Sequence, residues 1–111
     1  MKISFEGIGE NLVTFIGRDV KPGDPVKVSD AGTVSACAAG EAFDGFVAGL
    51  SGDYAGVILG GAVSVPYSGS APGFGSVELC ADGNGGVRSG SGSRCLVVDV
   101  DDVENSVTFI I

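Results

Sequence analysis

Histidine and tryptophan are both absent from this chain of 111 residues. Without histidine it lacks the commonest general base of enzymes, the usual Ser-His-Asp triad and most kinds of zinc site. Without tryptophan, only Tyr54 and Tyr67 remain as candidates for the exposed aromatic platform that a carbohydrate site needs. We therefore predict no catalytic residues and no enzymatic activity.

Basic residues are scarce, with six Lys and Arg against 14 Asp and Glu and a formal net charge of −8. Nucleic-acid binding needs clustered Lys and Arg, and anionic membranes attract the same side chains. The composition therefore predicts neither a nucleic-acid nor a membrane partner. An acidic surface of this kind serves solubility and makes copies of the chain repel one another.

The three cysteines have neither C-x-x-C spacing nor a histidine beside them, so they indicate no metal or thiol-protease site. Residues 1–6 reach Glu6 before any apolar segment can form, which is not the pattern of a secretory signal. We expect a cytoplasmic protein with reduced, buried thiols. A Cys80–Cys95 disulfide across one hairpin is the alternative.

Glycine is abundant, with 20 residues, and the apolar residues are mainly Val and Ile with several Phe. No segment has apolar residues at helical spacing over several turns, whereas short runs of β-branched and aromatic residues alternate with Gly, Pro and Asp turns. Strands are expected at 2–5, 11–16, 26–28, 33–37, 42–50, 54–59, 62–65, 76–80, 87–88, 94–100 and 106–111. This pattern predicts a single all-β domain, residues 1–111, folded as a small β-barrel or β-sandwich.

The order of turns and strands after residue 22 returns after residue 72, with Gly23 and Gly73 50 positions apart. The same offset places Leu50 on Val100, Val57 on Val107 and Leu59 on Phe109. We predict two pseudo-repeats, residues 20–60 and 70–110, with the same strand order in both.

The expected loop 66–75 is the longest in the chain and contains two aromatic residues among Pro, Gly and Ser. Such residues either plug the end of a barrel or contact a partner. For the second alternative, the candidate partner-binding residues are Pro66, Tyr67, Pro72 and Phe74.

The densest group of acids, residues 99–104, fails the calcium-loop pattern because Glu104 stands where glycine is required. We expect a solvated hairpin turn there. No Gly-Lys-Ser/Thr phosphate loop is present either. The sequence thus predicts no metal site and no cofactor.

Several glycine-rich strand motifs resemble small proteins from phage and prophage structural modules, including capsid-stabilising head-decoration proteins. The matching segments are Gly-Asp-Pro-Val-Lys-Val at 23–28, Gly-Thr-Val-Ser-Ala at 32–36, Phe-Val-Ala-Gly-Leu at 46–50, Val-Ile-Leu-Gly-Gly-Ala-Val-Ser-Val-Pro at 57–66 and residues 75–87. The resemblance covers roughly residues 20–111 and carries no catalytic signature.

The resemblance implies a non-enzymatic capsid accessory protein in the bacterial cytoplasm and the virion, with the phage major capsid protein as its partner. It also implies a homo-oligomer, often a trimer. The alternative function is a small ligand-binding module, for example for carbohydrate, and a capsid gene beside the gene for this chain would favour the first interpretation.

Overall fold

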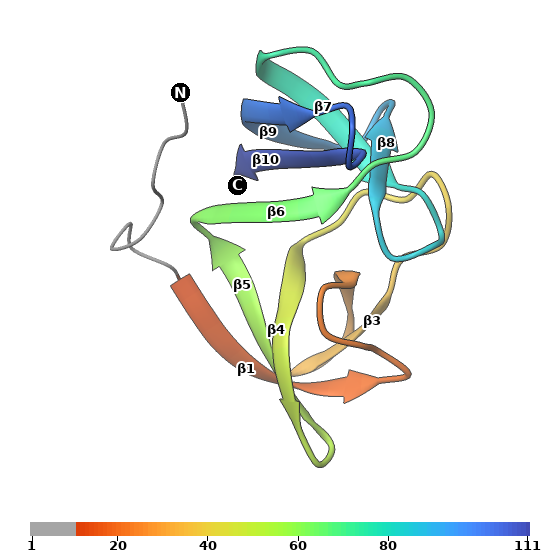
Figure 1. The fold of residues 1–111 in the computed structure, drawn as a ribbon. Helices are drawn as coiled ribbons and strands as arrows, with labels where there is room; N and C mark the ends of the chain where they lie inside the picture. The colour runs from red at the N-terminus through yellow and green to blue at the C-terminus, as the bar shows by residue number, and fades with distance from the viewer. Residues whose placement is uncertain (1–10) are drawn as a thin grey trace.

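The computed structural model describes residues 11–111, which form ten β-strands and no helix, as Figure 1 shows. The strands are β1 (Asn11–Arg18), β2 (Pro25–Asp30), β3 (Thr33–Ala36), β4 (Gly45–Ser51), β5 (Tyr54–Gly60), β6 (Ala62–Pro66), β7 (Gly75–Ala81), β8 (Val87–Ser89), β9 (Ser93–Asp101) and β10 (Ser106–Ile110). The predicted all-β class is confirmed. The strand expected at 2–5 lies outside the described residues. Within residues 11–111, no helix could cross a membrane.

The first five strands close into a barrel in the order β1-β3-β2-β4-β5, with β5 pairing back to β1. The β1–β3 pair is parallel and the other pairs are antiparallel. The interior holds small aliphatic side chains, because a five-stranded barrel has little room inside. They are Val20, Val26, Val34, Val47, Ala55 and Val57.

The last five strands form a second sheet in the order β6-β10-β9-β7-β8. An isolated parallel bridge between Tyr67, just after β6, and Val87, at the start of β8, joins the two outer strands of this sheet. The second sheet has no full strand pair between its edges, but this single bridge brings them together, and we call it the second barrel. Figure 1 shows the two units stacked, with β6 following β5 directly.

The two sheets have the same strand order: replacing β1–β5 by β6–β10 converts one into the other. Even the bulge is repeated, since the β4–β5 ladder is irregular between Val47 and Gly49 and the β9–β10 ladder at the corresponding pairs, Val97 and Asp99. The fold thus has the duplicated strand order that the sequence predicts. Each repeat begins earlier than predicted, because β1 and β6 belong to it.

The constant offset of 50 fails in the last strand. Val13 pairs with Val57 in the first barrel, and its counterpart Val63 pairs with Phe109 in the second. Val57 therefore corresponds to Phe109, so the predicted matches of Val57 with Val107 and of Leu59 with Phe109 are both wrong. The reason is turn length: two residues separate β4 from β5, whereas four separate β9 from β10. The predicted match of Leu50 with Val100 lies before this insertion and is correct.

The first repeat contributes two aromatic rings to the core of the second. The Phe46 ring centroid lies 4.7 Å from that of Phe43 and 5.6 Å from that of Phe109 on β10. Both Phe43 and Phe46 belong to the second core cluster. The Ser93 hydroxyl donates to the Phe43 carbonyl at 2.6 Å and accepts from the Phe43 N–H at 3.1 Å. These contacts join the two barrels through a shared core.

Glycines inside the strands mark close approach and bulges, as expected. At Gly45, a Cβ atom would lie 2.5 Å from the Ile58 carbonyl oxygen, so no larger residue fits without a shift. Gly49 lies at the bulge in β4. Gly61 has a φ of 112° and connects β5 of one barrel to β6 of the other. The Gly60–Gly61 pair thus lets one nearly continuous extended segment pass from the first sheet into the second.

Candidate functional site

The predicted site residues divide into a buried and an exposed pair. Tyr67 is 8% exposed and packs in the second core, and Pro72 is buried as well. Phe74 is 69% exposed, and Pro66 is also exposed. Of the two alternatives for aromatic residues on this loop, Tyr67 therefore plugs the end of the barrel, because its ring is already covered by this chain. Only Pro66 and Phe74 remain available to a partner.

Three hydrogen bonds hold the start of the 66–75 loop on the barrel. The Tyr67 N–H donates to the Asn105 carbonyl at 3.0 Å, and the Ser68 N–H donates to the Val87 carbonyl at 2.9 Å. The Ser68 hydroxyl donates to the Asp82 carboxylate at 2.6 Å. This end of the loop is therefore anchored by both its backbone and its side chains.

Asp82 organises the turn between β7 and β8. Its carboxylate accepts the Asn84 N–H at 2.7 Å and the Gly86 N–H at 3.0 Å, besides the Ser68 hydroxyl. Partial burial by itself raises the pKa of Asp82, but these hydrogen bonds to the charged form outweigh it and lower the pKa. The folded protein thus favours the ionised carboxylate.

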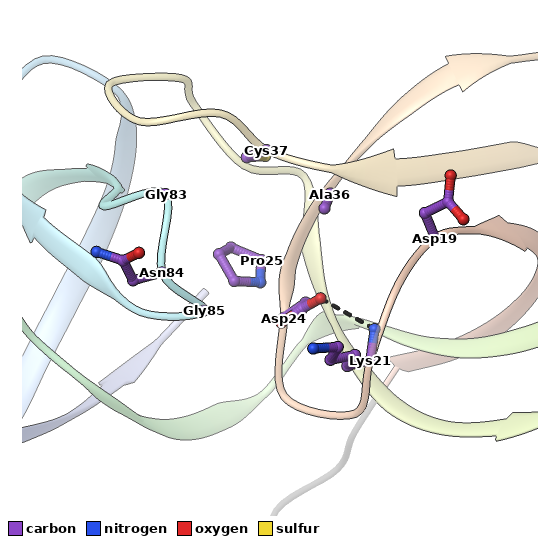
Figure 2. A pocket seen from close by; sticks show the side chains of 9 residues that line it. All are labelled: Asp19, Lys21, Asp24, Pro25, Ala36, Cys37, Gly83, Asn84 and Gly85. Carbon is purple, nitrogen blue, oxygen red and sulfur yellow. Dashed lines mark hydrogen bonds between the residues drawn. The ribbon is translucent and has the colours of Figure 1, made fainter.

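A polar pocket of about 400 Å³ lies where the β1–β2 loop meets the β7–β8 turn of the other barrel (Figure 2). One wall carries Asp19, Lys21 and Asp24, and the Asp24 carboxylate accepts the Lys21 N–H at 2.9 Å. The opposite wall includes Asn84. Mixed charges and an amide can hydrogen-bond a polar ligand but supply no apolar platform.

A second polar pocket of about 390 Å³ shares Asn84 with the first. Serines of the 66–75 loop, Asp82 and Arg88 line it. The two hollows therefore flank the β7–β8 turn, and no aromatic side chain lines either of them.

A third hollow, of about 380 Å³, is different because uncharged and mainly apolar residues line it. They are Leu12, Thr14, Ala48, Gly49, Leu50, Ser51, Tyr54 and Gly56, from β1, β4 and β5. Three large side chains in this group remain exposed: Leu12 at 54%, Tyr54 at 57% and Leu50 at 46%. We call this surface the apolar face of the first barrel.

The second barrel provides an internal comparison for this face. At the positions of Leu12 and Tyr54 it has Ala62 and Ser106, judged by the shared strand registers. At the positions of the two glycines it has the polar residues Asp99 and Thr108, and the Thr108 hydroxyl donates to the Ser64 hydroxyl at 3.0 Å. The second barrel keeps an apolar residue, Val100, at the position of Leu50, so its outer wall is more polar at these four positions and not throughout. Folding alone therefore does not require Leu12 and Tyr54 on the first barrel.

The three cysteines are buried free thiols, as predicted from their number and setting. Burial raises the pKa of the Cys37 thiol to about 11, with a further contribution from Glu41, and burial also raises that of Cys95 to about 11. Although Cys37 lines the first polar pocket, its thiol donates to the Ala42 carbonyl at 3.5 Å. At neutral pH Cys37 and Cys95 are therefore poor nucleophiles.

The acidic segment 99–104 contains the turn that joins β9 and β10. The Asp101 carboxylate accepts the N–H groups of Val103 and Glu104 at 3.0 and 3.1 Å, which is ordinary turn chemistry. Among residues 11–111, no three His, Cys, Asp or Glu side chains come together in a way that could hold a metal ion.

Glu41 ties the β3–β4 connection to β2. Its carboxylate accepts the Lys27 ammonium at 2.5 Å and the Ala38 N–H at 2.6 Å. The hydrogen bond from Lys27 is the main cause of a lowered Glu41 pKa, and it raises the pKa of Lys27 in return. Both side chains are 37% exposed, so this pair is a surface ion pair with a small effect on stability.

Sequence reasoning missed the apolar face. Leu12 and Tyr54 are 42 positions apart, and only the β1–β5 pairing brings their strands together. The available signal was the repeat itself: the offset of 50 places Leu12 on Ala62 and Gly49 on Asp99, so the first repeat has a large apolar residue and a glycine where the second has a small residue and an acid.

No protein-family model matches this chain, and the search of curated proteins found no match.

Proposed function

We propose that this chain is a non-enzymatic accessory protein that binds the surface of a larger protein assembly. By the resemblance of its strand motifs, the assembly is a phage capsid, the partner is the major capsid protein, and the setting is the bacterial cytoplasm and the virion. The resemblance also suggests that the protein binds as a homo-oligomer, such as a trimer.

The observation that carries this proposal is Phe74, which is 69% exposed beside a loop that is anchored on the barrel. Tyr67 and Pro72 are buried on the same loop. An anchored loop loses little conformational entropy when it docks, so more of the interaction energy appears as affinity. Exposed aromatic side chains are also the residues that most often dominate protein interfaces.

Co-sedimentation with assembled phage shells tests the proposal, using a major capsid protein from a gene cluster that also encodes this chain. We expect the parent protein to sediment with the shells and Phe74→Ala to bind at least about fivefold more weakly, since a buried aromatic anchor contributes more than about 1 kcal/mol. Val103→Ala is the matched control, because Val103 is 84% exposed on a different turn.

A further variant, Tyr67→Ala, distinguishes a residue that supports the fold from one that contacts the partner. Because Tyr67 is a core residue, this variant should melt at a lower temperature than the parent, whereas Phe74→Ala should not. A parent protein that fails to sediment with the shells, or a Phe74→Ala variant that binds as well as Val103→Ala, would show that the proposal is wrong.

A second candidate function is binding of a polar ligand such as a carbohydrate, and the two hollows that share Asn84 favour it. Their side chains offer several hydrogen-bonding groups, but no aromatic ring lines them. Titration calorimetry with a panel of oligosaccharides, on the parent and on Asn84→Ala, tests this candidate. Heat that is lost in Asn84→Ala would support it.

A further inference from the structure

We propose that a second copy of this chain docks on the apolar face of the first barrel, with the same face used by both copies. This inference does not depend on the proposed function, because the apolar face lies in the first repeat and Phe74 lies in the second. Each proposal can therefore fail without the other.

The first argument is the contrast between the repeats. At four corresponding outer positions, the first barrel has Leu12, Tyr54 and two glycines, whereas the second has two small residues and two polar ones. Since both repeats fold with the same strand order, the exposed Leu and Tyr are not needed for the barrel. Exposed apolar patches that the fold does not require mark interaction sites.

The second argument is electrostatic. The chain has a net charge of −8, so two copies repel each other over most orientations. None of the eight residues that line the apolar face is charged. When two copies meet through this face, no carboxylates of the lining residues are brought together, because the lining has none. Burying the face therefore buries no unpaired charge.

The third argument is shape. A contact between identical faces requires one surface that carries both a projection and a matching hollow. Leu12 and Tyr54 are exposed at the hollow, and Gly49 leaves open space where a side chain would stand, whereas the Leu12 Cδ2 atom already lies 3.8 Å from the Cβ position of Gly56. A projecting side chain of one copy can thus enter the hollow of the other, and the reverse contact forms at the same time.

The fourth argument is area. Leu12, Leu50 and Tyr54 each expose about half of their surface, and Tyr54 alone presents roughly 100 Å² when an aromatic side chain has about 150–250 Å². A stable interface buries about 800 Å² per partner, a little over half of it apolar. The apolar face can therefore form the centre of such an interface, with neighbouring polar residues as its rim.

The test replaces face residues by their own counterparts from the second repeat. Leu12→Ala with Tyr54→Ser removes the projections, and Gly49→Asp fills the hollow and adds a charge. A Cβ at Gly49 meets nothing within 4 Å, and Gly49 needs no left-handed backbone, so the folded monomer accepts this change. Leu96→Ala removes a side chain that is 46% exposed on the other barrel and is the matched control.

Sedimentation equilibrium over a concentration series measures the result, with circular dichroism to check the fold. We expect the parent to form pairs, Leu96→Ala to match it, and both face variants to raise the pair dissociation constant at least tenfold. A parent that stays monomeric at high concentration overturns the proposal, as does Gly49→Asp pairing like the parent. A parent mass of three chains also overturns it, because identical faces join only two copies; that outcome would instead agree with the trimer suggested under the proposed function.

Discussion

Phe46→Ala should destabilise the protein strongly, because the Phe46 side chain holds the two barrels together. It is 2% exposed and packs between Phe43 and the Phe109 ring of the other repeat. Truncation of a buried Phe to Ala costs about 3–5 kcal/mol, as the lost contacts and the cavity add together. That is a large part of the roughly 5–15 kcal/mol that stabilises a typical domain.

The expected change in melting temperature follows from the chain length. Unfolding entropy is about 2.1 cal/mol/K per residue, or roughly 0.23 kcal/mol/K for a chain of this size. Phe46→Ala should therefore lower the melting temperature by about 13–21 °C. Leu96 occupies the same position in the second repeat but is 46% exposed. Leu96→Ala should cost about 1 kcal/mol, or roughly 4 °C.

Differential scanning calorimetry measures both variants. We expect one cooperative transition for the parent, since the core of the second barrel includes two rings from the first repeat. Two separate transitions would mean that the barrels unfold independently and that the shared core does not couple them. Equal shifts for Phe46→Ala and Leu96→Ala would refute the argument that burial against the other barrel sets the cost.

Two further predictions concern ionisable groups. The first is a thiol titration with 5,5′-dithiobis(2-nitrobenzoic acid) at neutral pH without reductant, in which the unfolded protein should show three thiols. The folded protein should react slowly, because burial shields the sulfurs and raises the pKa of two of them to about 11. A count of one thiol in the unfolded protein would indicate a disulfide. The folded pKa values of Asp82 and Glu41 are lowered, so the stability they contribute is full above their unfolded pKa near 4 and is lost as the pH falls through the folded values. The urea unfolding midpoints of the parent and of Asp82→Asn should therefore differ at pH 7 and approach each other as the pH is lowered to 2. A difference between the two midpoints that stays constant over this range would contradict the prediction.

The strands and the duplication could be predicted from the amino-acid sequence. Alternation of apolar and polar residues, and the glycines and aspartates of turns, are local properties that a strand needs wherever it lies. The strand expected at each position from 11 to 111 is therefore present, with ends that differ by up to three residues. The repeated order of turns also predicted the repeated strand order, until the longer β9–β10 turn shifted the offset by two.

Which apolar residues are covered could not be predicted from the sequence, because it depends on how the strands pack in three dimensions. Tyr67 and Phe74 lie on the same loop, yet Tyr67 is buried because it closes the second barrel by pairing with Val87, 20 positions later. Phe46 and Leu96 occupy equivalent strand positions, yet only Phe46 lies against another barrel. Exposure depends on which distant strands are neighbours, and local alternation carries no information about that. For the same reason the apolar face became visible only when β1, β4 and β5 were placed side by side.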